Sequence, residues 1–363
     1  MTRPFVTIDV TKIEHNARSI VRLCAAHGID VVGVTKGTCG HPDVAKAMLR
    51  GGVSSIGESR MENIRRLKAE GVETSYMLLR IPPLSEVDEV AKSVDVSLNS
   101  ELSVLSGLSE AAGRRGRVHD VIIMIDLGDL REGILPADLV PFVRDVLRLQ
   151  GIRIVGIGTN LTCFGGIVPS ARNMNELVER AHDLERTFGL KLAWVSGANS
   201  SALELIASGH MPSRMNQARI GEGILLGRET VHRKPWPGTF QDAFVLHAEV
   251  LELKEKPSVP IGERGEDAFG KSPEFVDRGD IERAILNVGR EDVDVGGISP
   301  IDPNLAILGA SSDYLILDVS RAERRVRVGD ILTFSLNYSA LLAAMTSQYV
   351  EKRSTEPLPM LGA

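Results

Sequence analysis

Eight short apolar runs alternate with longer stretches of helical periodicity between residues 30 and 220 of the chain. The longer stretches place apolar side chains at helix spacing, as in Ala45, Met48 and Leu49. Strands of a parallel sheet are covered by helices and therefore read as near-continuous apolar runs. Eight of them in this length favour a closed (β/α)8 barrel over the alternative, a doubly wound open sheet. The predicted strands are Asp30–Thr35, Ser54–Gly57, Ser75–Arg80, Val94–Leu98, Val121–Leu127, Ile152–Thr159, Leu192–Ser196 and Ala218–Ile220.

The two ends of the chain differ from this pattern. A β-type run, Phe5–Val10, and a helical stretch, Ile13–Ala26, precede the first barrel strand. From about Phe240 onward, β-type runs are separated by turns rich in Gly, Pro and Asp: Phe244–Leu253, Ala284–Val288, Tyr314–Val319 and Ile331–Ser335. The sequence therefore predicts a barrel domain, residues 1–239, followed by a C-terminal all-β domain, residues 240–363. It leaves open whether residues 1–10 join the β domain.

The composition excludes several classes of protein. The net charge of −6 argues against a nucleic-acid partner, which would require a basic face. Three scattered cysteines form neither a disulfide framework nor a zinc site, and no His/Asp/Glu spacing predicts a metal. No signal peptide or membrane-spanning run is recognisable, so we expect a cytoplasmic protein without a membrane partner.

Barrel enzymes carry their chemistry at the carboxyl ends of the strands, so the residues that follow each run are candidates. Lys36 follows the first run directly. A lysine held there with a depressed pKa could attack an aldehyde, whereas a lysine that reaches solvent at the barrel rim is equally consistent. Arg131 follows the fifth run in a glycine-flanked loop. It could bind a substrate carboxylate, or it could pair with Asp129 or Glu132 on the surface.

The last strand ends are polar and rich in glycine. Asn160 lies in the loop after the sixth run, and Asn199 and Ser200 precede an apolar helix, where they are ordinary N-caps or part of a phosphate site. Arg219 lies in the eighth run and is followed by Gly221, Glu222 and Gly223. Exposed amides in the loops after strands seven and eight are where many barrels bind phosphate.

At these positions the chain resembles the alanine racemase family of fold-type III pyridoxal-phosphate enzymes, and most closely its branch of ornithine and broad amino-acid racemases. The resemblance covers nearly the whole chain and follows the family's order of motifs. The matching segments are Val34–His41, Asp126–Gly133, Ala198–Ser200, Arg219–Gly221 and Ser311–Asp318.

The resemblance implies an amino-acid racemase acting on ornithine, lysine or alanine. Pyridoxal 5'-phosphate would be held as a Schiff base on Lys36, which would also serve as one proton-transfer base. The same resemblance implies a homodimer, in which the loop carrying Ser312 and Asp313 closes the partner's site. The residues implied to bind the cofactor are Lys36, Asn199, Ser200, Arg219, Gly221 and Glu222, and those implied to bind substrate are Arg131, Asn160, Ser312 and Asp313.

The chain departs from the family pattern at the second base. Phe269 aligns with the tyrosine that supplies this base in the family, and Asn160 stands where the family commonly has a histidine. Alternative second bases are Asp267, Tyr338, Tyr349, Asp313 and Cys163. A decarboxylase, an aldolase or a non-catalytic pyridoxal-phosphate carrier are competing functions, although the β domain argues against the carrier. For a cationic substrate, Glu58, Asp129 and Glu222 are candidate carboxylates.

Overall fold

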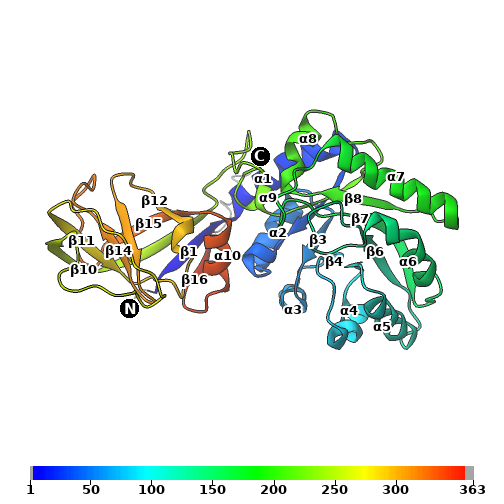
Figure 1. Ribbon diagram of the computed structural model, residues 1–363, viewed down its shortest axis with the longest axis horizontal. Coiled ribbons are helices and arrows are strands. Elements are labelled where there is room, and N and C mark those ends of the chain that lie inside the picture. Colours follow the sequence, from blue (N-terminus) through cyan, green and yellow to red (C-terminus); the bar gives the residue numbers. More distant parts are fainter. Residues whose placement is uncertain (1–2, 356–363) are drawn as a thin grey trace, which may run out of the picture. The chain divides into compact units, whose positions relative to one another are not determined.

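The computed structural model describes residues 3–355, and these divide into two compact units. One unit is formed by Val10–Gln241, and the other by the residues up to Asp9 together with those from Asp242 onward. Figure 1 shows the elements of both units.

The first unit contains a closed barrel of eight parallel strands, as the sequence predicted, so the doubly wound alternative is wrong. Each strand pairs with the next along the chain, and β9 closes the ring by pairing with β2, where Val32 lies opposite Arg219. The strands are β2 (Asp30–Val34), β3 (Ser55–Glu58), β4 (Tyr76–Leu78), β5 (Val96–Asn99), β6 (His119–Met124), β7 (Ile152–Gly158), β8 (Trp194–Ala198) and β9 (Gln217–Ile220).

Helices connect the strands and cover the outside of the barrel (Figure 1). The local sequence sets their ends: Pro42 occupies the first turn of α2, and Ser170 and Asn173 form a reciprocal capping box at the start of α7. Gly189 ends α7 with a φ of 67°, a conformation that favours glycine. The helices are α1 (Val10–Ala25), α2 (Pro42–Arg50), α3 (Met61–Ala69), α4 (Val87–Ser93), α5 (Leu102–Gly113), α6 (Leu139–Val146), α7 (Ala171–Phe188), α8 (Leu203–Ala207) and α9 (Glu222–Leu225).

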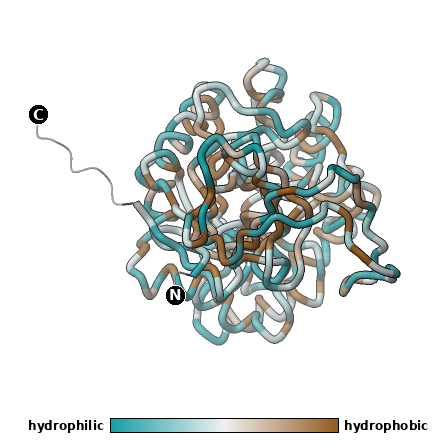
Figure 2. The backbone as a smooth tube through the Cα atoms, turned by 90° about the vertical axis from the view of Figure 1, so that its left-hand side faces the viewer, coloured by the Kyte–Doolittle hydropathy of each residue, from teal (hydrophilic) through white to brown (hydrophobic). Residues whose placement is uncertain are grey.

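A hydrophobic plug fills the barrel interior. We use this term for the buried cluster Val32, Met77, Val96, Leu98, Ile122, Met124 and Val155, with Leu79 and Trp194 packed against it. Interior side chains of such barrels stack in layers, so the barrel is a packed core and not a channel. Figure 2 colours the backbone of both units by hydropathy, and many of the outer loops in this view are hydrophilic.

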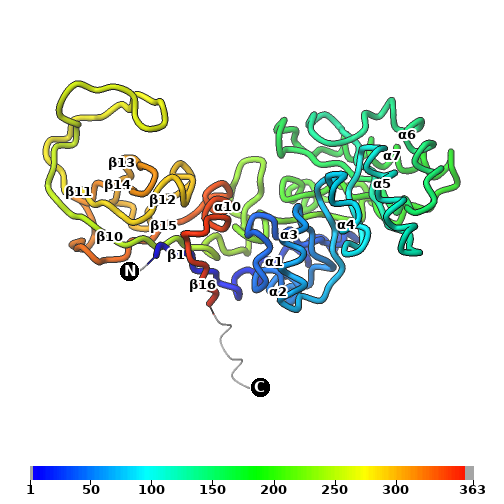
Figure 3. Tube along the Cα trace, turned by 90° about the horizontal axis from the view of Figure 1, so that it is seen from below, coloured from blue at the N-terminus to red at the C-terminus, as the bar shows by residue number. Residues whose placement is uncertain are grey.

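The second unit is built on antiparallel pairing in the order β12-β15-β10-β11-β14-β13. Strand β1 pairs antiparallel with β10 and parallel with β16, so the beginning of the chain belongs to this sheet. A long loop between β10 and β11 extends away from the sheet (Figure 3). The strands are β1 (Phe5–Asp9), β10 (Phe244–Pro257), β11 (Asp280–Leu286), β12 (Ile298–Pro300), β13 (Ala306–Ala310), β14 (Leu315–Asp318), β15 (Ile331–Leu336) and β16 (Glu351–Thr355).

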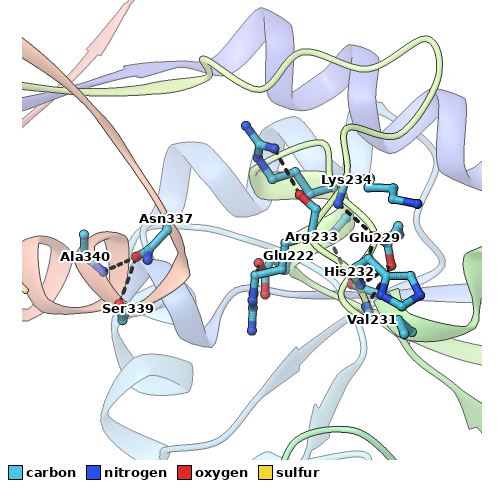
Figure 4. A network of polar contacts seen from close by, with 12 residues as sticks. Glu222, Glu229, Val231, His232, Arg233, Lys234, Asn337, Ser339 and Ala340 are labelled. Atoms are coloured by element: carbon cyan, nitrogen blue, oxygen red, sulfur yellow. Dashed lines mark hydrogen bonds and ion pairs between the residues drawn. The ribbon is translucent and has the colours of Figure 1, made fainter. Parts of the chain in front are cut away.

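This unit also contains helix α10 (Tyr338–Thr346), which is absent from the elements predicted from the sequence. Asn337 caps it by accepting a hydrogen bond from the Ala340 amide at 3.0 Å, with Ser339 beside it (Figure 4). The helix is apolar on most positions, Ala340, Leu341, Ala344 and Met345 being buried, so it lacks the polar stripe by which periodicity identifies a helix.

His119, the first residue of β6, predicts a pH dependence of stability. Its side chain is 4 % exposed, and its Nε2 lies 2.8 Å from Ser97 Oγ. Burial lowers the pKa of His119 from 6.5 to about 4, so the unfolded chain binds this proton more readily than the folded chain. Stability should therefore fall as the pH is lowered from about 6.5 toward 4. The linkage relation gives a loss of about 2 kcal/mol between pH 7.5 and pH 5.

The measurement is urea unfolding at these two pH values for the wild type and for His119→Gln, which cannot take up the proton. The variant should show a smaller loss of stability on acidification. An equal loss in both proteins would contradict the assignment.

Candidate functional site

The site is built around the turn that carries Lys36. A short 3-10 helix, Lys36–Thr38, follows β2 directly, and Cys39 then adopts a left-handed conformation with a φ of 53°. The amides of Thr38 and Gly40 both donate to the Thr35 carbonyl, at 2.9 and 3.3 Å. The Lys36 side chain is consequently displayed from a tight, hydrogen-bonded turn at the carboxyl end of the strand, where barrel enzymes place their reactive groups.

A buried carboxylate, Glu58 at the end of β3, supports this turn. It is fully buried and accepts hydrogen bonds from Thr35 Oγ1 at 2.6 Å, from Asn63 Nδ2 at 3.0 Å and from the Ser59 amide at 3.0 Å. Burial raises the pKa of Glu58, against the lowering effect of these hydrogen bonds and of the nearby charge of Lys36. The sequence predicts Glu58 only as a candidate carboxylate for a cationic substrate, and its contact with Thr35, the residue before Lys36, is seen only in the structure. A glutamate directly after a buried strand was the available signal.

Asn199 and Ser200 lie at the carboxyl end of β8. The Ser200 hydroxyl is buried and accepts a hydrogen bond from the Gly223 amide at 3.0 Å, which ties it to the start of α9. The Asn199 side chain donates to Asn160 Oδ1 at 3.3 Å and to the Leu161 carbonyl at 3.0 Å, and it accepts from the Ser201 amide. The structure thus brings Asn160, Asn199, Ser200 and the loop after β9 together.

Gly221, directly after β9, allows the end of this strand to pack closely against the end of β2. A Cβ at this position would come within 3.2 Å of both the Cβ and the carbonyl oxygen of Val34, two residues before Lys36. The Gly221 backbone therefore lies directly beside the strand that carries Lys36. Glycine at such a place allows a ligand to approach the backbone amides closely.

Arg219 is a buried cation without a carboxylate partner among residues 3–355. It is 6 % exposed, and its guanidinium donates to the Ser196 carbonyl at 2.7 Å, to the Ser196 hydroxyl and to the Thr159 carbonyl at 2.6 Å. Burial lowers the pKa of Arg219 to about 10, so the side chain stays charged at neutral pH. A buried charge held only by neutral acceptors is costly unless a further polar group completes its surroundings.

Two buried polar atoms beside Arg219 lack hydrogen-bond partners within the described part of the chain: Thr159 Oγ1 and Asn160 Nδ2. Buried polar groups are nearly always satisfied, so these atoms indicate room for a polar ligand at the ends of β7 and β9. These two atoms, together with Ser200 and the backbone at Gly221, fit a ligand that carries a phosphate group and a polar ring.

Arg131 lies in the loop after β6 and hydrogen-bonds Glu132 at 2.6 Å. Partial burial lowers the pKa of Arg131, but the Glu132 carboxylate outweighs this and raises it. The positive charge of Arg131 lowers the pKa of the buried Arg219, so the two guanidinium groups lie near each other. The surface pairing that the sequence left open is therefore present, and Arg131 is also close to the site.

The three carboxylates considered for a cationic substrate are all engaged within the chain. Besides Glu58, Asp129 is buried and accepts from the amides of Phe164 and Gly165 at 3.0 Å each. The Glu222 carboxylate binds Arg233 at 2.5 Å, next to the Glu229 carboxylate, which accepts from three backbone amides of the same loop (Figure 4). Burial raises the pKa of Glu222, and Arg233 opposes this.

Ser312, Asp313 and Phe269 belong to the second unit. The Ser312 carbonyl accepts from the Glu291 amide at 3.1 Å. Phe269 lies in the long loop after β10, with the Arg290 guanidinium 4.4 Å from the centre of its ring. A phenyl ring in this contact has no proton to transfer, and Asp267 beside it is bound by the amides of Phe269 and Lys271 at 2.9 Å each.

Within residues 3–355, no group of His, Cys, Asp or Glu side chains is arranged to hold a metal ion. In the same part of the chain, every helix is too short or too polar to cross a membrane.

Comparisons with known proteins place these observations in context. The family profile "Alanine racemase, N-terminal domain" matches residues 8–229. The chain is 46 % identical over 350 residues to the ornithine racemase of Acetoanaerobium sticklandii, which covers 96 % of this chain and 99 % of that protein. It is 42 % identical over 352 residues to the lysine racemase of Thermotoga maritima, which covers 97 % and 98 %.

Among solved structures, the alanine racemase from Bartonella henselae with covalently bound pyridoxal phosphate matches with a TM-score of 0.74. The match covers 98 % of this chain and 100 % of that one at 19 % identity, and it therefore supports the fold alone.

Proposed function

This chain belongs to the alanine racemase family and is an amino-acid racemase, and we propose that it racemises ornithine or lysine with pyridoxal phosphate linked to Lys36. The observation that carries the substrate class is the full-length identity of 46 % and 42 % to an ornithine and a lysine racemase. The family depends on pyridoxal phosphate, and the polar surroundings of Lys36 and Arg219 fit this cofactor.

Different residues of the chain have different roles in the proposed reaction. When bound, pyridoxal phosphate withdraws electrons from the substrate and so acidifies its α-hydrogen. Lys36 would hold the cofactor covalently through Nζ, and once the amino group of the substrate has displaced it, the freed Nζ would accept the α-proton. Arg131 binds the substrate carboxylate beside Asn160. Arg219 keeps its charge and donates hydrogen bonds.

The phosphate is proposed to lie between Asn199 and Ser200 on one side and the amides of Gly221 and Glu222 on the other. Ser200 is already fixed by the Gly223 amide, so its hydroxyl hydrogen is directed elsewhere and can be donated. The backbone amides supply further donors without any side-chain entropy to lose.

We also propose a homodimer in which Ser312 and Asp313 close the partner's site. Leu130 and Phe164, in the loops after β6 and β7, are 71 % and 74 % exposed, and large apolar side chains left in contact with water are typical of a surface that a partner covers. The exposed free thiol of Cys163 suits a reducing compartment, and this supports the expected cytoplasmic location.

The test of the proposed substrate class is turnover of single L-amino acids in D2O. Ornithine or lysine should give the D-enantiomer carrying deuterium at the α-carbon, with a kcat/KM at least about tenfold above that of alanine, equivalent to about 1.4 kcal/mol of transition-state binding. A preference for alanine would contradict the substrate assignment. Amine or aldehyde products would instead favour a decarboxylase or an aldolase.

A further inference from the structure

The loop after β6, which carries Arg131, is fastened to the loop after β7 by a buried carboxylate. Asp129, two residues before Arg131, is 1 % exposed, and its two oxygens accept hydrogen bonds from the amides of Phe164 and Gly165 at 3.0 Å each. Hydrogen bonds to an ionised acceptor are roughly twice as strong as neutral ones. Asp129 therefore joins two loops that α6 and β7 separate along the chain.

Gly165 shows how closely the two loops approach each other. A Cβ at this position would lie 2.9 Å from the Asp129 carbonyl oxygen and 3.3 Å from the Asp129 Cα. The first of these distances is too short for a carbon atom beside backbone, so a side chain at residue 165 would push the loops apart. Glycine permits such a close approach between backbones.

The conformation of the loop after β6 also depends on contacts of this kind. Leu130, directly before Arg131, has a φ of 52°, a left-handed conformation that is unfavourable for a bulky residue. Strained backbone persists only where the surrounding structure holds it in place. Asp126 holds the loop from one side by accepting from the amides of Gly128 and Leu130 at 2.8 and 3.1 Å, and Asp129 holds it from the other.

The loop after β7 continues the connection to the proposed phosphate site. Thr162 Oγ1 lies 2.8 Å from the Ile167 carbonyl oxygen and 3.0 Å from Ser201 Oγ. The Ser201 amide in turn donates to Asn199 Oδ1 at 2.8 Å. Polar contacts thus extend from the loop of Arg131 to Asn199, and every residue in them belongs to the barrel unit.

We propose that Asp129 is a positioning residue for Arg131: its buried carboxylate fixes the loop so that the guanidinium meets the carboxylate of the substrate. This inference rests on the proposed role of Arg131 in substrate binding. The printed hydrogen bonds of the Asp129 carboxylate use both oxygens on backbone amides, so Asp129 acts through the loop and not on the substrate. A displacement of about 1 Å in a binding group can lower a rate by about 10²-fold.

The experiment is steady-state racemisation of ornithine by two holoenzyme variants that disturb the contact in different ways. Asp129→Asn keeps the shape but turns one acceptor oxygen into an NH2 group that faces a donor amide. Gly165→Ala leaves the carboxylate in place and forces the loops apart. Both variants should raise KM by at least about tenfold while kcat stays close to that of the wild type, because substrate binding and not proton transfer is impaired.

A double-mutant cycle separates positioning of Arg131 from a general loss of structure. Arg131→Ala should raise KM by itself, and adding Asp129→Asn to it should raise KM no further, since the group to be positioned is gone. Calorimetry gives a readout without turnover. Pentanoate, which has the carboxylate and chain length of ornithine, should bind at least about tenfold more weakly to Asp129→Asn than to the wild type, whereas pentanamide should bind both equally.

Two matched controls belong to the same unit. Asp138→Asn removes an exposed carboxylate between β6 and α6, and Gly113→Ala adds a Cβ in α5 that meets no atom within 4 Å. Both should match the wild type in KM and in pentanoate binding. If Asp129→Asn does not fold, Gly165→Ala still tests the same contact.

An unchanged KM in Asp129→Asn and Gly165→Ala, with a raised KM in Arg131→Ala, would overturn this inference and leave the proposed function intact. Additive effects of Arg131→Ala and Asp129→Asn on KM would also overturn it, because Asp129 would then act independently of Arg131. An unchanged KM in Arg131→Ala would instead contradict the role of Arg131 itself, and the inference with it.

Discussion

Lys36→Ala should remove the visible absorption band of the purified holoenzyme and lower kcat for racemisation by at least about 10³-fold. The variant loses both the amine that forms the covalent link and the group that moves the α-proton. Proton transfer by a positioned side chain alone contributes about 10²–10⁴-fold to a rate. The two measurements are an absorption spectrum after incubation with pyridoxal phosphate and the appearance of the D-enantiomer.

Lys92→Ala is the matched control, because Lys92 is an exposed lysine of α4 in the same unit. It should retain both the band and the activity. A Lys36→Ala protein with an unchanged spectrum would show that another residue carries the cofactor, and the assignment of the active site would be wrong.

Glu58→Ala should lower the free energy of unfolding by several kcal/mol and reduce cofactor binding at the same time. It leaves the Thr35 hydroxyl, the Asn63 amide and the Ser59 amide without their buried acceptor. Each buried donor that loses its partner costs about 1–3 kcal/mol. Thr35 directly precedes Lys36, so the loss should also loosen the turn from which Lys36 is displayed.

Glu58→Gln removes the negative charge of the side chain and keeps its shape, so it separates the effects of the two on stability. The amide fills the same volume and still offers one acceptor oxygen, so this variant should lose less stability than Glu58→Ala. Urea unfolding of the cofactor-free protein measures the stability, and titration with pyridoxal phosphate measures the binding. Equal stability of Glu58→Ala and the wild type would contradict the supporting role.

The pH dependence of the free energy of unfolding gives a second comparison between the wild type and Glu58→Gln. Burial raises the pKa of Glu58, so the folded chain holds this proton more tightly than the unfolded chain. The contribution of Glu58 to stability is therefore greatest below the ordinary pKa of a glutamate and decreases as the pH rises through the raised pKa. Glu58→Gln should lack this decrease, and its stability relative to the wild type should improve between pH 4 and pH 8.

The sequence predicted the barrel because its signals are local. Buried parallel strands are apolar throughout, and the helices between them repeat their apolar positions, so eight strands could be counted without any contact information. Strand ends were less predictable, since β6 begins at His119 and not at Val121. His119 is a polar residue whose burial depends on Ser97 in the neighbouring strand, and a single-sequence pattern does not contain that partner.

The sequence predicts candidate site residues where motifs and strand ends coincide, as at Lys36, Ser200 and Arg219. The role of Glu58 was not predictable, because it depends on Thr35 and Asn63, which reach it from other elements.

Strand β1 has a consequence for the order in which the chain can fold during synthesis. Phe5 pairs with His247 and with Glu351, so both neighbours of β1 follow the whole barrel in the chain. The barrel of Val10–Gln241 has all of its strands before that point. Domains generally fold as units from the amino terminus. We therefore expect the barrel to close first, while β1 stays unpaired until β10 and β16 have been made.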